Sequence, residues 1–434
     1  MRIAWCTPFS PESAIGMVSQ AAVEELALRD GVEVDVWHPA TSGGRTWSGA
    51  THRLDLDRLE DLEEYDGVVY HLGDHAPNHL DLWKASLQVP GLVVLHDVVL
   101  RNLFHGYLLE NGVYAEEFGR WYGAEAEARA AEALDSGFTD RRWLEEDLER
   151  YPFLSLATLG ARHVLVHSRF AAGRVAEEVL ADAAVVGLPV VPPAAAPPTP
   201  AAGVPDDRPV VLQAGMFNPN KRIDVVLAGF AELVHHRPAH LVLAGRGGQL
   251  GLDVVRRLVL ESGVEDVTVV DNPSDATLAA LRARADVGVV LREPCLEGAS
   301  YAMLESLAAG VPLVVVDDGS YAEVTGNFVA HVPTPPQPAD VARALGTLLD
   351  RDRTAVAGDA RAFVAAQHTP ASYADGVLRT LREGAGAGPR RRLVADLSAV
   401  LDAWGLAEID GVIDTVAQRA AELFGADPVV PPVR

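Results

Sequence analysis

Cysteine and lysine are scarce in this 434-residue sequence, and each shortage excludes a class of site or partner. Cys6 and Cys295 are the only cysteines, too few for a disulfide framework or a cysteine-rich zinc site. Lys84 and Lys221 are the only lysines, and 36 Lys and Arg residues face 61 Asp and Glu residues, giving a formal net charge of −25. Because nucleic acids and anionic lipids are bound through phosphate-neutralising cations, the sequence predicts no nucleic-acid partner.

Long apolar runs are also lacking. No stretch reaches the roughly 18 uncharged apolar residues of a membrane-spanning helix, so no stable membrane span is expected. Residues 1–6 lack the apolar segment of a secretory signal. With 49% hydrophobic and 22% charged residues, the composition is that of a globular protein, and we expect a cytoplasmic one.

Short apolar runs alternate with helical patterns in both halves of the chain. Predicted strands include residues 91–95 in the first half and residues 210–214 and 287–291 in the second. Such alternation is typical of βαβ units around a mainly parallel sheet. The predicted fold class is therefore α/β, with two doubly wound Rossmann-like domains facing across a cleft. Ligands are expected at the carboxyl ends of the strands.

Proline and glycine content predicts the domain boundaries. Residues 189–209 are rich in proline, which favours a semi-rigid linker between an N-terminal domain, 1–188, and a C-terminal domain, 210–384. Residues 385–434 follow a glycine-rich joint and carry an apolar stripe typical of amphipathic helices. This helical tail is either a cap on the body of the protein or a homodimerisation element.

An aromatic-rich helical segment, residues 101–151, interrupts the first half of the chain. Aromatic residues at helical spacing are typical of a packed core. A second interpretation is a wall that binds the acceptor substrate, with Trp121 and Trp143 as its candidate residues.

The run from residue 289 to Pro312 predicts a strand, a loop and a short helix. Ser300 is a candidate N-cap and Gly310 a candidate C-terminal stop, so the helix is expected over residues 301–309. The unpaired N–H groups and positive dipole at the start of such a helix suit a phosphate or another oxyanion.

Two glutamates flank this helix start. If all the steps between Glu297 and Glu305 were helical, their Cα atoms would lie about 12 Å apart. That is wider than the roughly 5–9.5 Å of paired glycosidase carboxylates, which disfavours a hydrolytic pair. The spacing fits two carboxylates that bind hydroxyls at opposite ends of one long ligand. The alternatives are a solvated helix face for Glu305 and a loop salt bridge for Glu297.

Two glycine-containing turns follow predicted strands of the second half. The first contains Gly215 and leads to Lys221 and Arg222, a pair of cations suited to a diphosphate, or else a charged surface turn. It lacks the P-loop pattern. The second contains Gly245, which serves close backbone packing or, as the second interpretation, contacts a nucleoside.

In the first half, an apolar strand ends at His96 and Asp97. A histidine at the carboxyl end of a strand can donate to a sugar hydroxyl or transfer a proton near neutral pH. The alternative is a structural histidine that Asp97 satisfies.

Together these runs resemble family 4 of the retaining glycosyltransferases, which have the GT-B architecture. The resemblance covers roughly residues 1–384 and is strongest around Glu297 and Glu305, which are followed by Ala-Ala-Gly-Val-Pro. The turn from Gly215 to Arg222 is similar to the family's donor-diphosphate element. The runs 291–300, 94–97 and 167–170 resemble those of a bacterial subgroup.

The resemblance implies a nucleoside-diphosphate sugar as donor, with UDP slightly preferred over GDP, and retention at the anomeric carbon. Glu297 would contact the donor sugar and Glu305 the ribose. Lys221 and Arg222 would stabilise the diphosphate leaving group, and His96 would contact the sugar or assist the acceptor. No metal and no further cofactor are expected. The remaining donor-binding candidates are Gly215, Gly245, Arg292, Ala299, Ser300 and Tyr301.

The acceptor is expected to be a glycan or natural-product intermediate. The subgroup's first loop usually reads Pro-x-x-Ser-Gly-Ile-Ala, but here the glycine has moved two positions, to Gly16, so this loop is assigned to the acceptor. The other acceptor-side candidates are Asp97, Arg169, Trp121 and Trp143. Alternative functions are a sugar-nucleotide epimerase or a phosphorylase of the same architecture, and a catalytically silent nucleotide-binding scaffold.

Overall fold

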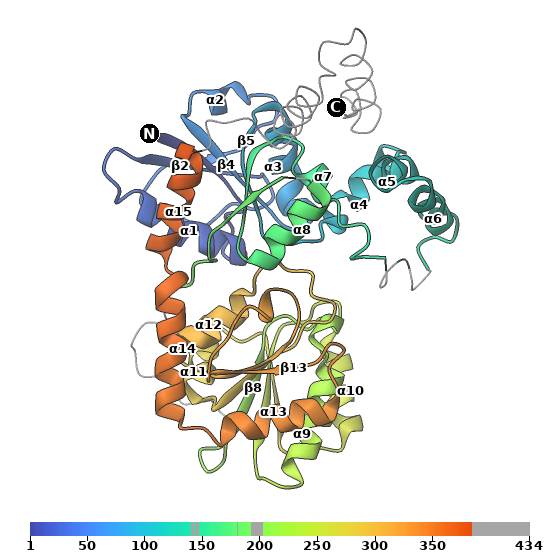
Figure 1. The fold of residues 1–434 in the computed structure, drawn as a ribbon, viewed down its shortest axis with the longest axis vertical. Helices are drawn as coiled ribbons and strands as arrows, with labels where there is room; N and C mark the ends of the chain where they lie inside the picture. Colours follow the sequence, from blue (N-terminus) through green and yellow to red (C-terminus); the bar gives the residue numbers. More distant parts are fainter. Residues whose placement is uncertain (140–142, 144–146, 180, 192–202, 384–434) are drawn as a thin grey trace, which may run out of the picture. The chain divides into compact units, whose positions relative to one another are not determined.

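A computed structural model describes residues 1–139, 143, 147–179, 181–191 and 203–383 (Figure 1). The chain forms two compact units. Among the described residues, the first unit comprises Met1–His167, Ala171–Val186 and Ala374–Glu383, and the second comprises Ser168–Phe170 and Gly187–Tyr373. Each unit is built around one parallel sheet, which confirms the two predicted doubly wound domains. No helix in the described ranges is long and apolar enough to cross a bilayer.

The sheet of the first unit has seven parallel strands. Strands β1, β4 and β5 are buried almost throughout, as expected for a parallel sheet with helices on both faces. The strand order reverses between β1 and β4. In spatial order the strands are β3 (Thr51–Arg53), β2 (Glu33–His38), β1 (Arg2–Cys6), β4 (Gly67–Leu72), β5 (Gly91–Leu95), β6 (Ala161–Val166) and β7 (Ala183–Val185). The helices beside them are α1 (Ala14–Leu26), α2 (Glu60–Glu63), α3 (Ala76–Gln88), α7 (Leu154–Ala157) and α8 (Arg169–Val179).

The aromatic insertion after β5 folds as α4 (Arg101–Glu110), α5 (Tyr114–Tyr122) and α6 (Ala124–Asp135) (Figure 1). Its aromatic side chains pack on one another. Trp143 is 1% exposed, its ring lies 4.9 Å from that of Phe118, and the Arg101 guanidinium lies 4.1 Å from its centroid. The core interpretation therefore holds for Trp143, and its assignment to the acceptor side is corrected, because a buried ring lines no open surface. Trp121 is half-buried, and its Nε1 donates to Glu117 at 3.0 Å.

The second unit has six parallel strands. Helices α9, α10 and α13 pack on one face of the sheet and α11, α12 and α14 on the other (Figure 1). The strands are, in spatial order, β10 (Val267–Asp271), β9 (His240–Gly245), β8 (Val210–Ala214), β11 (Val287–Val290), β12 (Leu313–Val316) and β13 (Val329–Val332). The helices are α9 (Ile223–Val234), α10 (Leu252–Ser262), α11 (Asp275–Arg284), α12 (Tyr301–Ala309), α13 (Pro338–Leu349) and α14 (Arg353–Gln367), with 3-10 turns η2 (Pro219–Lys221) and η3 (Gly319–Tyr321).

The C-terminal boundary of the second unit differs from the expected one at residue 384. Helix α15 (Pro370–Glu383) leaves this unit at Tyr373, and its remainder packs with the first unit. There Asp375 accepts a hydrogen bond from Arg29 at 2.9 Å. The glycine-rich run thus follows a helix that has already changed unit. The predicted helical tail, 385–434, and most of the predicted linker lie outside the described residues.

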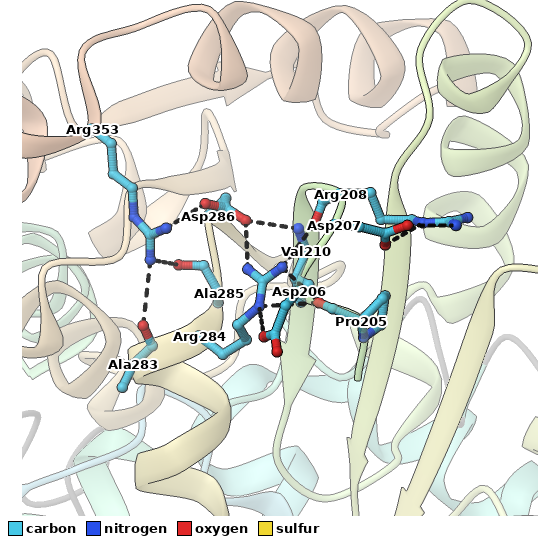
Figure 2. A network of polar contacts seen from close by, with 10 residues as sticks. All are labelled: Pro205, Asp206, Asp207, Arg208, Val210, Ala283, Arg284, Ala285, Asp286 and Arg353. Carbon is cyan, nitrogen blue, oxygen red and sulfur yellow. Dashed lines mark hydrogen bonds and ion pairs between the residues drawn. The ribbon is translucent and has the colours of Figure 1, made fainter. Parts of the chain in front are cut away.

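A charged network joins the amino ends of β8 and β11 (Figure 2). Asp286, just before β11, accepts hydrogen bonds from the backbone N–H of Val210 at 2.8 Å and from Arg284 at 2.9 Å. Arg353, at the start of α14, donates to the other oxygen of Asp286 at 2.6 Å. Since parallel strands bind ligands at their carboxyl ends, this network is a structural one.

We predict that Asp286→Ala destabilises the second unit by about 2–3 kcal/mol, because the substitution removes an acceptor shared by a backbone amide and two arginines. Calorimetric unfolding would measure the loss. The matched control is Asp253→Ala on α10, an exposed aspartate paired with Arg256 at 3.9 Å, which should cost less than about 0.5 kcal/mol. Equal effects of the two substitutions would contradict a structural role for the network.

Candidate active site

The strand order of the second unit reverses between β8 and β11, so their carboxyl ends form its topological switch point. Open parallel sheets bind ligands at this place, because the loops that follow the two strands diverge there. The two loops are joined directly: the N–H of Glu293 donates to the carbonyl of Asn220 at 2.8 Å. The predicted residues after both strands therefore lie in one site.

Lys221 is the buried cation of this site. It ends η2 and is 5% exposed, its Nζ lies 3.4 Å from the carbonyl oxygen of Ala214, and its own carbonyl accepts from Gln213 at 2.9 Å. Gly215 makes room for it, since a Cβ there would lie 2.6 Å from Nζ and the φ of Gly215 is +110°. Burial, and then the charge of Arg292, lowers the pKa of Lys221 to about 7, against an opposing effect of Glu297.

Glu297 is held by two donors. The buried Arg292, two residues after β11, places its Nε 3.1 Å from Oε1 of Glu297. The hydroxyl of Tyr321, a fully buried residue on η3, donates to the same oxygen. The alternative of a loop salt bridge for Glu297 thus describes one of its contacts. Tyr321 is not among the residues predicted from the sequence, where its signal is a tyrosine in a turn after the next apolar strand, β12.

Helix α12 has the predicted bounds, Tyr301–Ala309. Ser300 is its N-cap and accepts from the N–H of Met303 at 3.4 Å, and Gly310 ends the helix with a φ of +86°. Ala299 and Tyr301 are half-buried at this end of the helix. A short loop from Glu297 to Ser300 therefore places the N-terminus of α12 beside the first glutamate, as the anion-binding hypothesis requires.

Glu305 lies on α12 and is paired. Arg282, on α11, donates to its Oε2 at 2.5 Å. Burial, and then the charge of Asp275, raises the pKa of Glu305, while Arg282 opposes this shift. The side chain is 26% exposed, so the interpretation as a solvated helix face does not hold. Arg282 orients the carboxylate.

Two other donor-side candidates have structural partners. Arg222, which precedes α9, pairs with Asp224 at 3.1 Å and also with Glu293, so a diphosphate would have to compete with two carboxylates for it. At Gly245, a Cβ would lie 2.1 Å from the carbonyl oxygen of Gly215. This glycine lets β9 and the end of β8 pack closely, which is the first of the two roles considered for it.

In the first unit, His96 follows β5 and belongs to a histidine cluster. Its Nε2 lies 2.9 Å from Nδ1 of His71 on β4, and its ring centroid lies 4.9 Å from that of His167. Burial, and then the charge of His167, lowers the pKa of His96 well below its ordinary value, so its imidazole is neutral at pH 7. His71 is not among the residues predicted from the sequence, and β4 brings it beside the end of β5.

Asp97 accepts from the backbone N–H of Asp74 at 2.8 Å. Asp74, also missed, caps α4 through the N–H groups of Asn102 at 2.7 Å and Leu103 at 3.0 Å. Burial, and then Asp97, raises the pKa of Asp74 to about 7. The carboxyl ends of β4 and β5 therefore carry two neighbouring carboxyl groups and a neutral histidine.

The remaining acceptor-side candidates, Gly16 and Arg169, belong to different units. Gly16 is in the first turn of α1, where its N–H donates to Ser13 at 3.0 Å and a Cβ would lie 2.8 Å from the carbonyl oxygen of Pro8. Arg169 belongs to the second unit and pairs with Glu323 at 3.4 Å.

Within the described ranges, no group of three or more His, Cys, Asp and Glu side chains is arranged to hold a metal ion.

Comparison with known proteins finds similarity to glycosyltransferases. Residues 199–381 match the family described as "Glycosyl transferases group 1". A D-inositol 3-phosphate glycosyltransferase 2 from Catenulispora acidiphila is 33% identical over 34% of this chain and 36% of its own length. An MMP alpha-(1->4)-mannosyltransferase from Mycolicibacterium hassiacum is 33% identical over 30% of this chain and 33% of its own. The chain thus spans about a third of the length of these curated relatives.

The fold likeness extends over nearly the whole described chain. The structure of sucrose-phosphate synthase from Thermosynechococcus elongatus is 16% identical and aligns with a TM-score of 0.59, covering 88% of this chain and 98% of its own. The predicted GT-B fold class is confirmed by such neighbours. Lys221, Arg292, Glu297 and Glu305 all lie inside the segment that matches the glycosyl transferases group 1 family, on a chain with the GT-B fold.

Proposed function

We propose that this protein is a retaining glycosyltransferase that moves a sugar from a nucleoside diphosphate to an acceptor hydroxyl. The observation that carries the proposal is the set of Lys221, Arg292 and Glu297 at the switch point of the second sheet, inside the segment that matches the glycosyltransferase family. Both curated relatives are glycosyltransferases by name.

The donor diphosphate would lie between Lys221 and the N-terminus of α12. Lys221 is buried, and cations act more strongly on a developing charge where water is excluded. As the bond between the anomeric carbon and the diphosphate breaks, these groups stabilise the departing phosphate oxygens. The acceptor oxygen bonds to the same face of the sugar, and its proton leaves with the diphosphate.

The two glutamates would bind different parts of the donor. Glu297, held by Arg292 and Tyr321, would bind hydroxyls of the sugar beside the reacting carbon. Glu305, which lies about one helical turn into α12 and is held by Arg282, would bind the ribose. In the first unit, the neutral His96 and the carboxyl group of Asp97 would serve the acceptor or the sugar. We further propose that the enzyme is cytoplasmic and metal-independent, that its donor is a UDP-sugar, and that its acceptor is a glycan or natural-product intermediate.

Calorimetric titration with UDP, GDP, TDP and ADP in the presence of EDTA tests the donor site. We expect micromolar binding of one nucleotide, followed by transfer from its sugar derivative to a hydroxyl with retained configuration. Conversion of the donor sugar without any acceptor would favour an epimerase. Absence of binding to all four would favour the silent scaffold.

We predict that donor binding loads a proton onto Lys221. With a pKa of about 7, Lys221 is mostly neutral at pH 8, and a bound diphosphate would restore its charge. Binding at pH 8 should therefore take up most of a proton, and affinity should fall as the pH rises above 7, by at most about tenfold per pH unit. Calorimetry in buffers of different ionisation enthalpy measures this uptake.

The chain supplies its own control, because Lys84 is the only other lysine and lies on α3 of the first unit. Lys221→Met should abolish the proton uptake and lower turnover, whereas Lys84→Met should leave both unchanged. Proton uptake that persists in Lys221→Met would rule out this lysine as the titrating group.

We predict that substitutions of the two glutamates affect different quantities, kcat for Glu297 and nucleoside-diphosphate affinity for Glu305. Glu297→Gln should lower kcat by about 100-fold with little change in nucleoside-diphosphate affinity, because its contact belongs to the reacting sugar. Glu305→Gln should weaken nucleoside-diphosphate binding by about tenfold, the worth of one hydrogen bond to a charged group. Steady-state kinetics and calorimetry measure the split, with the exposed Glu261→Gln on α10 as control. Reversed effects would contradict the assigned contacts.

A further inference from the structure

Tyr321 contacts Glu297 from a third strand end. It lies on η3, which follows β12, and its side chain is fully buried. Its hydroxyl donates to Oε1 of Glu297. Burial raises the pKa of this hydroxyl well above its ordinary value, so it is protonated at neutral pH and acts as a donor.

The same carboxylate oxygen receives a second donor. Nε of Arg292 lies 3.1 Å from Oε1, so one oxygen of Glu297 receives both contacts. The two donors arrive from different elements, the end of β11 and η3, so together they restrict the orientation of the carboxylate more than either contact alone.

The turn that carries Tyr321 is itself fixed. The side chain of Asp318 accepts from the N–H of Gly319 at 2.7 Å, and the carbonyl of Tyr321 lies 3.2 Å from Nε2 of His331 on β13. Gly319 has a φ of +56°, and a Cβ there would lie 2.3 Å from Sγ of Cys295. The turn therefore packs directly on the loop that holds Glu297, and the hydroxyl is presented at a set place.

We propose that Tyr321 is a positioning residue of the donor site, whose hydroxyl orients the Glu297 carboxylate toward the reacting sugar. This inference rests on the proposed function for the role of Glu297, while the contact itself does not. If Tyr321 served only the core, any acceptor would satisfy its buried hydroxyl. Removal of the hydroxyl would then leave the orientation of the Glu297 carboxylate unchanged.

Tyr321→Phe removes only the hydroxyl, and two measurements on the full chain test its role. In the crystal structure of this variant, the Glu297 carboxylate should occupy a changed or a mixed orientation while Arg292 keeps its place. In kinetics, kcat should fall by about tenfold, the worth of one hydrogen bond to a charged group, while nucleoside-diphosphate affinity stays within twofold. Tyr373→Phe, at another fully buried tyrosine, is the matched control and should change neither quantity.

A double-mutant cycle separates positioning from general stability. Tyr321→Phe introduced into Glu297→Gln should lower kcat no further, because the group that it orients is already gone. An equal further loss in that background would show a structural effect and overturn the proposal.

The two measurements also distinguish this inference from the proposed function. A carboxylate that keeps its wild-type orientation in Tyr321→Phe overturns the positioning role, whatever the activity. A carboxylate that moves while transfer is unaffected supports the positioning role and counts against the part of Glu297 in catalysis.

Discussion

The pairing of β8 with β11 is the constraint on which the candidate site depends. The two strands are far apart in sequence, yet Val211 and Leu212 lie beside Val287 and Gly288 in the sheet. At their amino ends Asp286 binds the backbone of Val210, and at their carboxyl ends the two loops share a backbone hydrogen bond. Without this pairing, Lys221 would have neither Arg292 nor Glu297 as a neighbour.

Burial sets the electrostatics of the site more than the overall charge does. The net charge of −25 suggests a poor partner for a diphosphate, but distant charges are screened beyond about 8 Å at physiological salt. Locally, Lys221 and Arg292 are both removed from water, and their repulsion together with desolvation makes Lys221 only weakly basic. An anionic ligand would offset the repulsion between the two cations and supply a counter-charge to both.

The features that short-range chemistry specifies could be predicted from the sequence. The bounds of α12 follow from an N-capping serine and a glycine that can adopt a positive φ, and both residues do what the pattern indicates. The alternation of apolar strands and helices predicted both sheets. Predictions from local sequence were wrong where the outcome depends on residues far away in the chain. Helix α15 passes into the first unit before the glycine-rich run. The ring of Trp143 is buried against Arg101 and Phe118.

The sequence by itself determined the fold class and the strand ends at which chemistry-bearing residues stand, because hydrophobic period, caps and turn residues act over a few positions. Tertiary structure alone decided the partners of these residues. Arg222 pairs with Glu293, Glu305 with Arg282, and Glu297 with Tyr321. The two members of each pair are 23 to 71 positions apart in the chain, and the order of the strands in the sheet brings them together. Such contacts leave no periodic trace in the sequence, since sheet topology, and not spacing along the chain, brings the two members together.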